Sequence, residues 1–399
     1  MSRPESFAPP AADLTALGRK GLVLGLVALA VSAAGWAAAP ERFFRSWLIG
    51  WVFVFGIVLG AYGILLVHTL SRGAWGLVIR RTLEAASRTI PLFALFFVPV
   101  LLGASALYPW TDAARVAKDE ILLHQSAFLN LPFFLVRMVL YFAIWGGGAA
   151  LLSSLSQSQD TSGDPAGVER KMQVVAGPAL VLHILAVTFF AVDVMMSLNP
   201  HWFSTIYGLY LLAGQAVSGM ALVVLVALFL SRREPMSRVL APTHVHDWGK
   251  LLLAFMMLWS YFAFSQFLII WSGDLPEEIG FFKDRFTGGW GAVALGLVLF
   301  HFAVPFLLLL SRDLKRDVRK LSVVAAILLA MRWVDLWWLA IPAFSPKQLS
   351  FHWLDLVTPL AMGGIALWAF TVQLKSRPLL PAADPNLPAA LPAAEAHHG

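Results

Sequence analysis

The chain has no cysteine among its 399 residues, and charged residues make up only 13% of it. The absence of cysteine excludes disulfides, cysteine-ligated iron–sulfur clusters and thioether-attached haem in this chain. Soluble globular domains carry about 25% charged residues, whereas this chain is 59% hydrophobic, so it is not a soluble globular protein. Its basic residues stand in short segments between apolar runs. That distribution indicates membrane topology and no nucleic-acid partner.

Ten apolar segments are each long enough to cross a membrane, which takes about 20 residues of helix. They are 20–39, 44–70, 88–107, 131–153, 174–198, 203–230, 248–272, 289–311, 321–341 and 352–374. We therefore predict an all-α polytopic membrane protein with about ten transmembrane helices. The polar start, 1–19, shows no cleavable signal, so the first span is expected to stay. The Pro/Ala-rich tail, 375–399, is predicted to be disordered.

The distribution of Lys and Arg predicts the orientation of the spans. Of these 29 residues, 20 lie in connections on the side of the N-terminus, 7 lie on the opposite side, and Arg137 and Arg332 lie within spans. By the positive-inside rule, both termini lie in the cytoplasm. On the outer side, 109–130 predicts a short amphipathic surface helix and 272–287 an ordered, turn-rich loop. We expect an extramembrane partner to dock there.

A short internal repeat divides the chain into two halves. Val192-Asp193 ends the fifth span and Val334-Asp335 the ninth, and a proline follows each aspartate seven residues later. Both spans run from inside to outside, so both aspartates lie at the same depth, about 10 Å below the outer end. The repeat predicts two four-helix bundles, 44–198 and 203–341, flanked by spans 20–43 and 352–374. Such repeats commonly frame a site.

Ionisable residues inside spans are costly and often functional. The candidates are Arg137, Asp193, Asp335 and Asp355 in the outer half, His183, His301 and Arg332 near the middle, and His68 toward the cytoplasmic end. Arg332 and Asp335 are three residues apart, so they can form an ion pair on one helix face. Two interpretations stay open. The arginines neutralise the aspartates structurally, or these groups transfer protons or hold the headgroup of a ligand.

Cofactors are not expected in this chain. A b-type haem needs two histidines facing each other, but His68, His183 and His301 occur singly on three spans. Residues 243–247 contain two histidines that could ligate a metal, but capping of the next helix by Thr243 or Asp247 is the simpler interpretation. The aromatic run 259–271 carries polar side chains at helical spacing. It lines a flat apolar cavity suited to a quinone ring, or else forms a packed core.

Four stretches resemble the NrfD- and PsrC-like integral membrane subunits, closest to the second NrfD-like (ActF-type) subunit of alternative complex III. They are Trp75-Gly76-Leu77-Val78-Ile79-Arg80-Arg81, His246-Asp247-Trp248-Gly249-Lys250-Leu251-Leu252, 264–278, and 301–306 through 311–316. The resemblance covers roughly residues 40–375. It implies ten spans with two four-helix bundles, spans 2–5 and 6–9, in the bacterial inner membrane.

The resemblance also implies a function and partners. The chain would be a cofactor-free subunit of a quinol:cytochrome c oxidoreductase that uses menaquinol or ubiquinol. Its partners would be a second NrfD-like subunit, an iron–sulfur subunit, haem c subunits and small membrane subunits. We expect it to contribute proton transfer, quinol interaction or anchoring of the redox subunits. Two alternatives stay open: a stand-alone secondary transporter, against which broken-helix signals within the spans are weak, and a purely structural anchor.

Overall fold

Ten long apolar helical segments form the body of the protein in the computed structural model, which describes residues 7–391. They are Ala11–Ala38, Pro40–Ser71, Arg80–Leu102, Leu131–Gln159, Pro165–Leu198, Tyr207–Leu230, Pro242–Gly273, Trp290–Leu310, Val318–Ala343 and Leu354–Leu374. No strand occurs within the described residues. The predicted all-α class with ten spans is confirmed.

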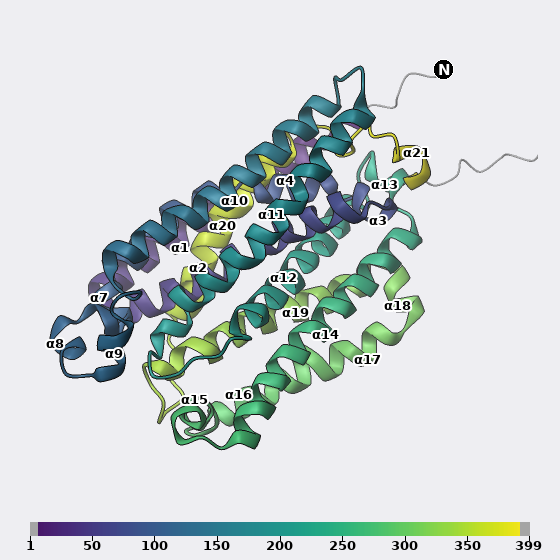
Figure 1. Cartoon of the computed structure of the whole chain (residues 1–399). Coiled ribbons are helices and arrows are strands. Elements are labelled where there is room, and N and C mark those ends of the chain that lie inside the picture. The colour runs from purple at the N-terminus through teal and green to yellow at the C-terminus, as the bar shows by residue number, and fades with distance from the viewer. Residues whose placement is uncertain (1–6, 392–399) are drawn as a thin grey trace, which may run out of the picture.

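Both ends of the described chain lie at one end of the bundle (Figure 1). We call this the terminal end and the opposite one the distal end. The backbone N–H of Leu379 donates to the carbonyl of Phe7 at 2.8 Å, which ties the two ends of the chain together. An even number of spans requires this arrangement. Which end faces the cytoplasm stays a prediction.

The helices reach further at the terminal end than the apolar runs do. Helix α1 (Ala11–Ala38) begins at Ala11 instead of 20, and α11 (Pro165–Val194) begins at Pro165 instead of 174. Helix α10 (Leu131–Gln159) continues to Gln159 instead of 153. Hydropathy detects only the part of a helix that hydrocarbon surrounds, whereas hydrogen bonding carries the helix on into polar sequence.

Two spans are irregular, contrary to the expectation of weak broken-helix signals. The third, Arg80–Leu102, consists of α4 (Arg80–Ser87), α5 (Ile90–Phe96) and α6 (Val98–Leu102), and α7 (Ala104–Leu107) follows it. Pro91 and Pro99 stand in the first turns of α5 and α6, where their missing N–H groups interrupt the ladder. The eighth joins α16 (Trp290–Leu297) to α17 (Val304–Leu310) through a π-helical turn, Val298–Ala303, which contains His301.

The distal connections differ from their predictions. Residues 109–130 hold a 3-10 turn, Pro109–Thr111, and two short helices, α8 (Ala113–Val116) and α9 (Glu120–Gln125), instead of one helix. The expected turn-rich loop is the helix α15 (Pro276–Phe286). Proline in its first turn, glutamates beside it, and Lys283 and Arg285 in its last turn suit the helix dipole, so a helix forms there.

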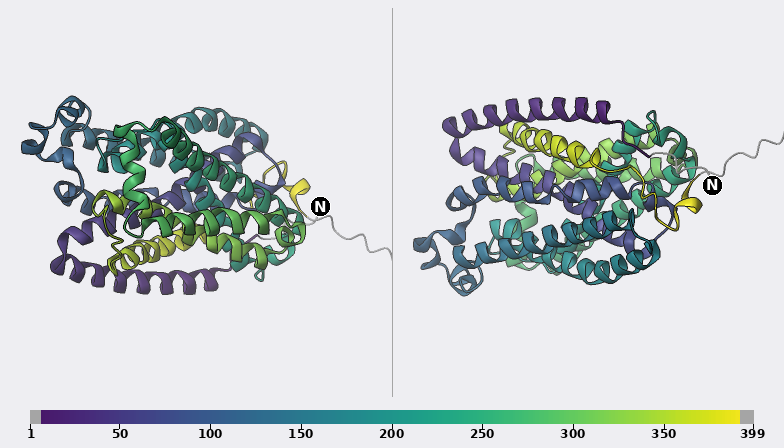
Figure 2. Two further views of the ribbon diagram at one scale, coloured as in Figure 1. Left: turned by 90° about the horizontal axis from the view of Figure 1, so that it is seen from below. Right: turned by 90° about the horizontal axis from the view of Figure 1, so that it is seen from above.

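The two halves of the chain meet along α2 (Pro40–Ser71) and α12 (Tyr207–Leu230). Helix α2 also packs on α4 and α11, and α12 on α14 (Pro242–Gly273) and α19 (Val318–Ala340). The first and last spans, α1 and α20 (Leu354–Leu374), lie together on the outside of α2, as Figure 2 shows. The second of the charge centres described below lies among helices of the second half, α12, α14 and α19.

Glycines allow the close approach of the two halves. A Cβ on Gly60 would lie 1.8 Å from the carbonyl oxygen of Gln215, and one on Gly219 would lie 2.4 Å from the carbonyl carbon of Gly60. Glycines within 214–219 therefore serve close helix packing between the halves. Gly146 and Gly147 do not, because a Cβ on either would have no described atom of another segment within 4 Å.

The prediction of disorder is wrong for residues 375–391, which we call the C-terminal strap. It folds back over the terminal end and includes the short helix α21 (Leu387–Ala390), which packs on α3 (Ala74–Leu77). Leu380 is fully buried, and Asp384 forms an ion pair with Arg80 at 2.8 Å. The strap folds because its few leucines and one carboxylate find partners on the bundle. Residues 1–6 and 392–399, for which a cytoplasmic segment and a disordered tail are expected, lie outside the described residues.

Candidate functional site

The first buried charge centre joins Arg137 of α10 to Asp193 of α11. The Asp193 carboxylate accepts from Arg137 Nη2 at 2.7 Å and from its Nε at 2.9 Å, and from the hydroxyl of Tyr141 at 2.8 Å. The guanidinium also donates to the carbonyl of Phe128 and lies over the rings of Phe128 and Phe133. Both charges are buried and satisfied, as a structural ion pair requires.

The second centre lies in the other half, on α19. Arg332 forms an ion pair with Asp335, as the spacing predicts, and the hydroxyl of Tyr210 on α12 donates to the same carboxylate. Trp259 of α14 donates its indole N–H to Asp335 at 3.0 Å. Gly214 makes room for the guanidinium, since a Cβ there would lie 2.2 Å from its central carbon.

The two aspartates occupy equivalent places but have different surroundings. Each stands near the end of a long helix that is followed by a 3-10 turn, Met196–Leu198 after Asp193 and Ile341–Ala343 after Asp335. Asp193 takes its arginine from a neighbouring helix, whereas Asp335 takes its arginine from its own. Within residues 7–391 no hydrogen bond or ion pair joins the two centres.

A cavity of about 620 Å³ adjoins the second centre. Asp335, Tyr210 and Trp259 form part of its wall, together with aromatic side chains of α14, α15 and α19. The run 259–271 contributes Trp259, Tyr261 and Phe264. Of the two interpretations of this run, a cavity lining and a packed core, the structure shows the cavity lining; what occupies the cavity stays a proposal.

Two buried histidines lack hydrogen-bond partners among the described residues. His301, in the π-helical turn, lies with its ring 3.9 Å from that of Trp259, and neither of its ring nitrogens has a protein partner. His183 is in the first half, where its ring meets Tyr62 edge-on at 5.3 Å. Buried polar groups in native proteins are seldom unpartnered, and exceptions are often functional. His301 thus belongs to the second centre, while His183 stands apart from both.

Asp355 forms a third, separate site at the start of α20. Its carboxylate accepts from the hydroxyl of Ser46 at 2.5 Å, from the indole of Trp337 at 3.1 Å and from the backbone N–H of His352 at 2.9 Å. No cation pairs with it among residues 7–391. These neutral donors join α20 to α2 and α19, so Asp355 serves the packing of the last span.

The terminal end contains a network of ion pairs between residues that the hydropathy pattern places in exposed connections. It consists of three arginines and three carboxylates: Arg80, Arg81, Arg377, Glu84, Asp160 and Asp384. Glu84 accepts from Arg80 at 3.0 Å and from Arg81 at 2.8 Å, and all three are buried. His68 is also buried at this end, where its ring meets Trp75. His68 therefore lies at the opposite end of the bundle from both aspartates.

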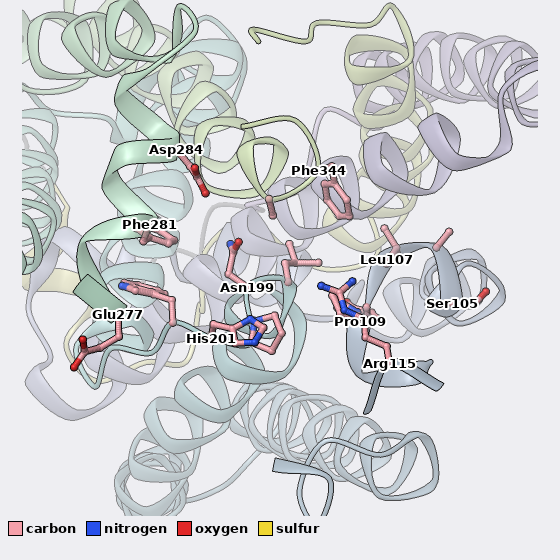
Figure 3. A pocket seen from close by; sticks show the side chains of 17 residues that line it. Ser105, Leu107, Pro109, Arg115, Asn199, His201, Glu277, Phe281, Asp284 and Phe344 are labelled. Carbon is pink, nitrogen blue, oxygen red and sulfur yellow. The ribbon is translucent and has the colours of Figure 1, made fainter. Parts of the chain in front are cut away.

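A second large cavity, of about 410 Å³, opens at the distal end between the two halves. Figure 3 shows Glu277, Phe281 and Asp284 of α15 on one side, Arg115 on the other and His201 between them. His201 also bonds Asp119 at 2.7 Å. The two predicted docking connections therefore face each other across one pocket.

Arg285 lies behind this pocket as a fully buried cation without a carboxylate partner in the described chain. It donates to the carbonyls of Phe281 and Leu339 and stacks on the Phe281 ring at 3.3 Å. Burial lowers the pKa of Arg285 to about 9, because an apolar environment disfavours its charge.

Sequence reasoning missed the residues that complete the centres. Tyr141 and Tyr210 donate to the aspartates from other helices, and Arg285 was counted with the basic residues of an outer loop. Tyr141 is 52 positions from Asp193 and Tyr210 is 125 positions from Asp335, and nothing in a single sequence pairs residues that far apart. No family model matches the chain, and no curated protein sequence matches it.

Proposed function

We propose that this chain is a cofactor-free membrane subunit of a quinol-oxidising complex of the alternative complex III type, and that it transfers protons at Asp335. The complex would lie in the bacterial inner membrane, with both termini of this chain in the cytoplasm. A second NrfD-like subunit, an iron–sulfur subunit and haem c subunits would carry the electrons. The sequence stretches that resemble the family support the class of complex.

One observation carries the choice of Asp335. It is a fully buried carboxylate that also lines a large cavity, whereas Asp193 is enclosed by Arg137 and Tyr141. A group that exchanges protons needs access to a donor as well as a charge environment that tolerates both states. Among the two equivalent aspartates, only Asp335 has both.

The chemistry follows from the acid–base properties of these groups. Oxidation of a quinol releases protons, and a carboxylate within hydrogen-bond reach can accept them. Arg332 stabilises the ionised form of Asp335 before transfer, and Tyr210 and Trp259 hold its oxygens in place. His301 lies against Trp259, and neither of its ring nitrogens has a partner among the described residues, which supports our proposal that it relays a proton near this centre.

An outlet toward the distal end is built from neighbouring polar groups. The ring of Tyr207 lies 6.3 Å from that of Tyr210, and Tyr207 is near enough to the buried Arg285 for a charge interaction. Asp284, the neighbour of Arg285 in sequence, lines the distal pocket. If the distal end faces outward, as the distribution of basic residues predicts, protons leave on the outer side. The redox subunits would dock over the same pocket.

The test replaces each aspartate by asparagine in the assembled complex. Asp335→Asn should lower quinol:acceptor turnover and proton release per assembled complex by about a hundredfold, within the range usual for loss of an acid–base group. Asp193→Asn is the matched control, and the complexes that assemble with it should turn over within about twofold of the parent. Tyr210→Phe keeps the ion pair but removes a donor to Asp335, and should slow turnover less.

The result that would refute proton transfer is unchanged turnover and unchanged proton release in Asp335→Asn. If Asp335→Asn reduced only the yield of complex, a purely structural anchor would be the better description. Tyr210→Phe then serves as the second measurement, because it leaves no buried charge unpaired.

The broken third span favours a second candidate, a stand-alone secondary transporter. Transporters place sites at interrupted helices between repeats, and Pro91 and Pro99 interrupt this span. A cavity of about 320 Å³ lies beside it, lined by Arg88, Pro91 and Gly146. The purified chain alone in proteoliposomes should then catalyse proton-coupled uptake of a solute. A pure subunit should show no transport without its partners.

A further inference from the structure

The 620 Å³ cavity of the second half opens on the side of the bundle, within the membrane-spanning zone. Tyr261 and Phe264 stand at its mouth on α14 and are 62% and 61% exposed. Both lie well inside the span Pro242–Gly273. A molecule that enters here comes from the bilayer, so it must be lipophilic. Pockets of about 300–1,000 Å³ are usual for small-molecule ligands.

The lining of the cavity is mostly apolar and aromatic, with a few polar groups. Phe267, Phe282 and Trp338 line it, and these side chains suit a planar ring. Two of the residues that line it, Asp335 and Gln266, bring buried polar groups to its wall. Gln266 is 4% exposed, and its Oε1 has no partner among the described residues. A buried acceptor that lines a cavity and lacks a donor indicates a ligand with a hydroxyl or N–H group.

Other lipophilic molecules fit these polar groups poorly. No Lys, Arg or His is among the described residues that line the cavity, so no cation there would pair with an anion. A phospholipid headgroup or a fatty acid is therefore disfavoured. A bare acyl chain would leave the Gln266 acceptor unused. The remaining requirement is a neutral planar ring that donates hydrogen bonds.

We propose that this cavity binds the headgroup of an isoprenoid quinol, with the ring between the aromatic side chains and a hydroxyl donating to Gln266 or Asp335. The isoprenoid tail leaves through the mouth at Tyr261 and Phe264 into the bilayer. The inference rests on the proposed function in naming the proton donor to Asp335. It concerns binding only, so it can be measured without turnover.

The experiment uses the purified full-length chain in phosphatidylcholine nanodiscs and an azido-benzoquinol that carries a short isoprenoid tail. After photolysis, the modified residues should fall within 257–267 and 294–302, and excess decylubiquinol should remove the labelling. Ala263→Trp fills the cavity and should reduce labelling at least tenfold. Val139→Trp is the matched control, because Val139 is a 70% exposed position on α10 in the other half.

Gln266→Leu provides a measurement that does not depend on filling the cavity. It should weaken the Kd for decylubiquinol about fivefold. At about 1.4 kcal/mol per tenfold, that is close to the strength of one neutral hydrogen bond. Equal melting temperatures for parent and variant show that the fold is kept.

Two results would overturn the proposal. One is labelling spread over exposed apolar positions and indifferent to Ala263→Trp. The other is labelling that added phosphatidylcholine removes and decylubiquinol does not, which would identify a phospholipid as the occupant. If the parent chain binds the probe but Asp335→Asn leaves turnover normal, only the proton-transfer proposal is refuted. If Asp335→Asn abolishes turnover but the parent chain does not bind the probe, only the quinol site is refuted.

Discussion

One carboxylate, Asp384, joins the C-terminal strap to the bundle by an ion pair, so Asp384→Asn should make local opening of the strap more frequent. The ion network at the terminal end is balanced, with three arginines against three carboxylates, and Asp384 supplies one of the charges that Arg80 contacts. Asparagine keeps an acceptor for the backbone N–H of Asn386 but removes the charge. Arg80 retains Glu84, Ser156 and Gln159 as partners, so the substitution does not strand it.

The expected loss follows from this one interaction. A hydrogen bond to a charged group contributes about 1.5–3 kcal/mol, and about 2 kcal/mol is a suitable value for a pair at 2.8 Å with both partners buried. If the strap opens locally, this converts to an opening equilibrium constant about thirtyfold larger, at about 1.4 kcal/mol per tenfold.

Hydrogen–deuterium exchange measures this directly in the detergent-solubilised chain. The amide of Leu379, which is bonded to Phe7, and that of Leu391, which is bonded to Leu387, should exchange about thirtyfold faster in Asp384→Asn. Asp247→Asn is the control, because the Asp247–Lys250 pair is largely exposed and should leave the strap unchanged. Exchange of the strap within about twofold of the parent would refute the reasoning.

Three further predictions concern packing, charge and pH. Gly60→Ala should strongly reduce the folded yield by size-exclusion chromatography, because its methyl meets backbone, while Gly147→Ala should have no effect. Asp193→Asn leaves Arg137 as a buried, unpaired cation, and should lower the free energy of unfolding in a denaturant titration by about 3–5 kcal/mol. The double variant with Arg137→Met should regain most of this free energy, and no regain would contradict a structural ion pair. The pKa of Asp119 is lowered by the backbone N–H groups of α9 that it caps and by His201. Its capping contacts should therefore be fully present above the ordinary pKa of an aspartate, and should be lost only as the pH falls through the lowered pKa. Amide exchange of α9, corrected for the intrinsic rate, checks this, and loss of protection at neutral pH would contradict it.

Hydropathy predicted the number and rough position of the spans because crossing the hydrocarbon is a local requirement of each segment. It could not predict the helical extensions at the terminal end, since polar residues there continue the same hydrogen-bonded ladder. Nor did it predict the interrupted third span, although Pro91 and Pro99 were present as signals. The prediction that the strap is disordered was wrong for a related reason. A Pro/Ala-rich composition carries no information about the surface of the bundle on which the strap packs.

For the candidate site, the Arg332–Asp335 pair was predictable because both residues share one helix face. The likeness of Asp193 and Asp335 was also visible in the local pattern. The difference between them was not. It arises from Tyr141, Tyr210 and Trp259, which reach the carboxylates from other helices.

The sequence by itself determined that this is a ten-span helical membrane protein with paired acids near matching helix ends, because apolar length and residue spacing are properties of single segments. Only the tertiary structure decided that one aspartate is closed off and the other lines a cavity. Access to a buried group depends on how neighbouring helices fill space around it. In this chain, Arg137 and Tyr141 enclose Asp193, whereas the aromatic residues beside α14 leave a cavity against Asp335.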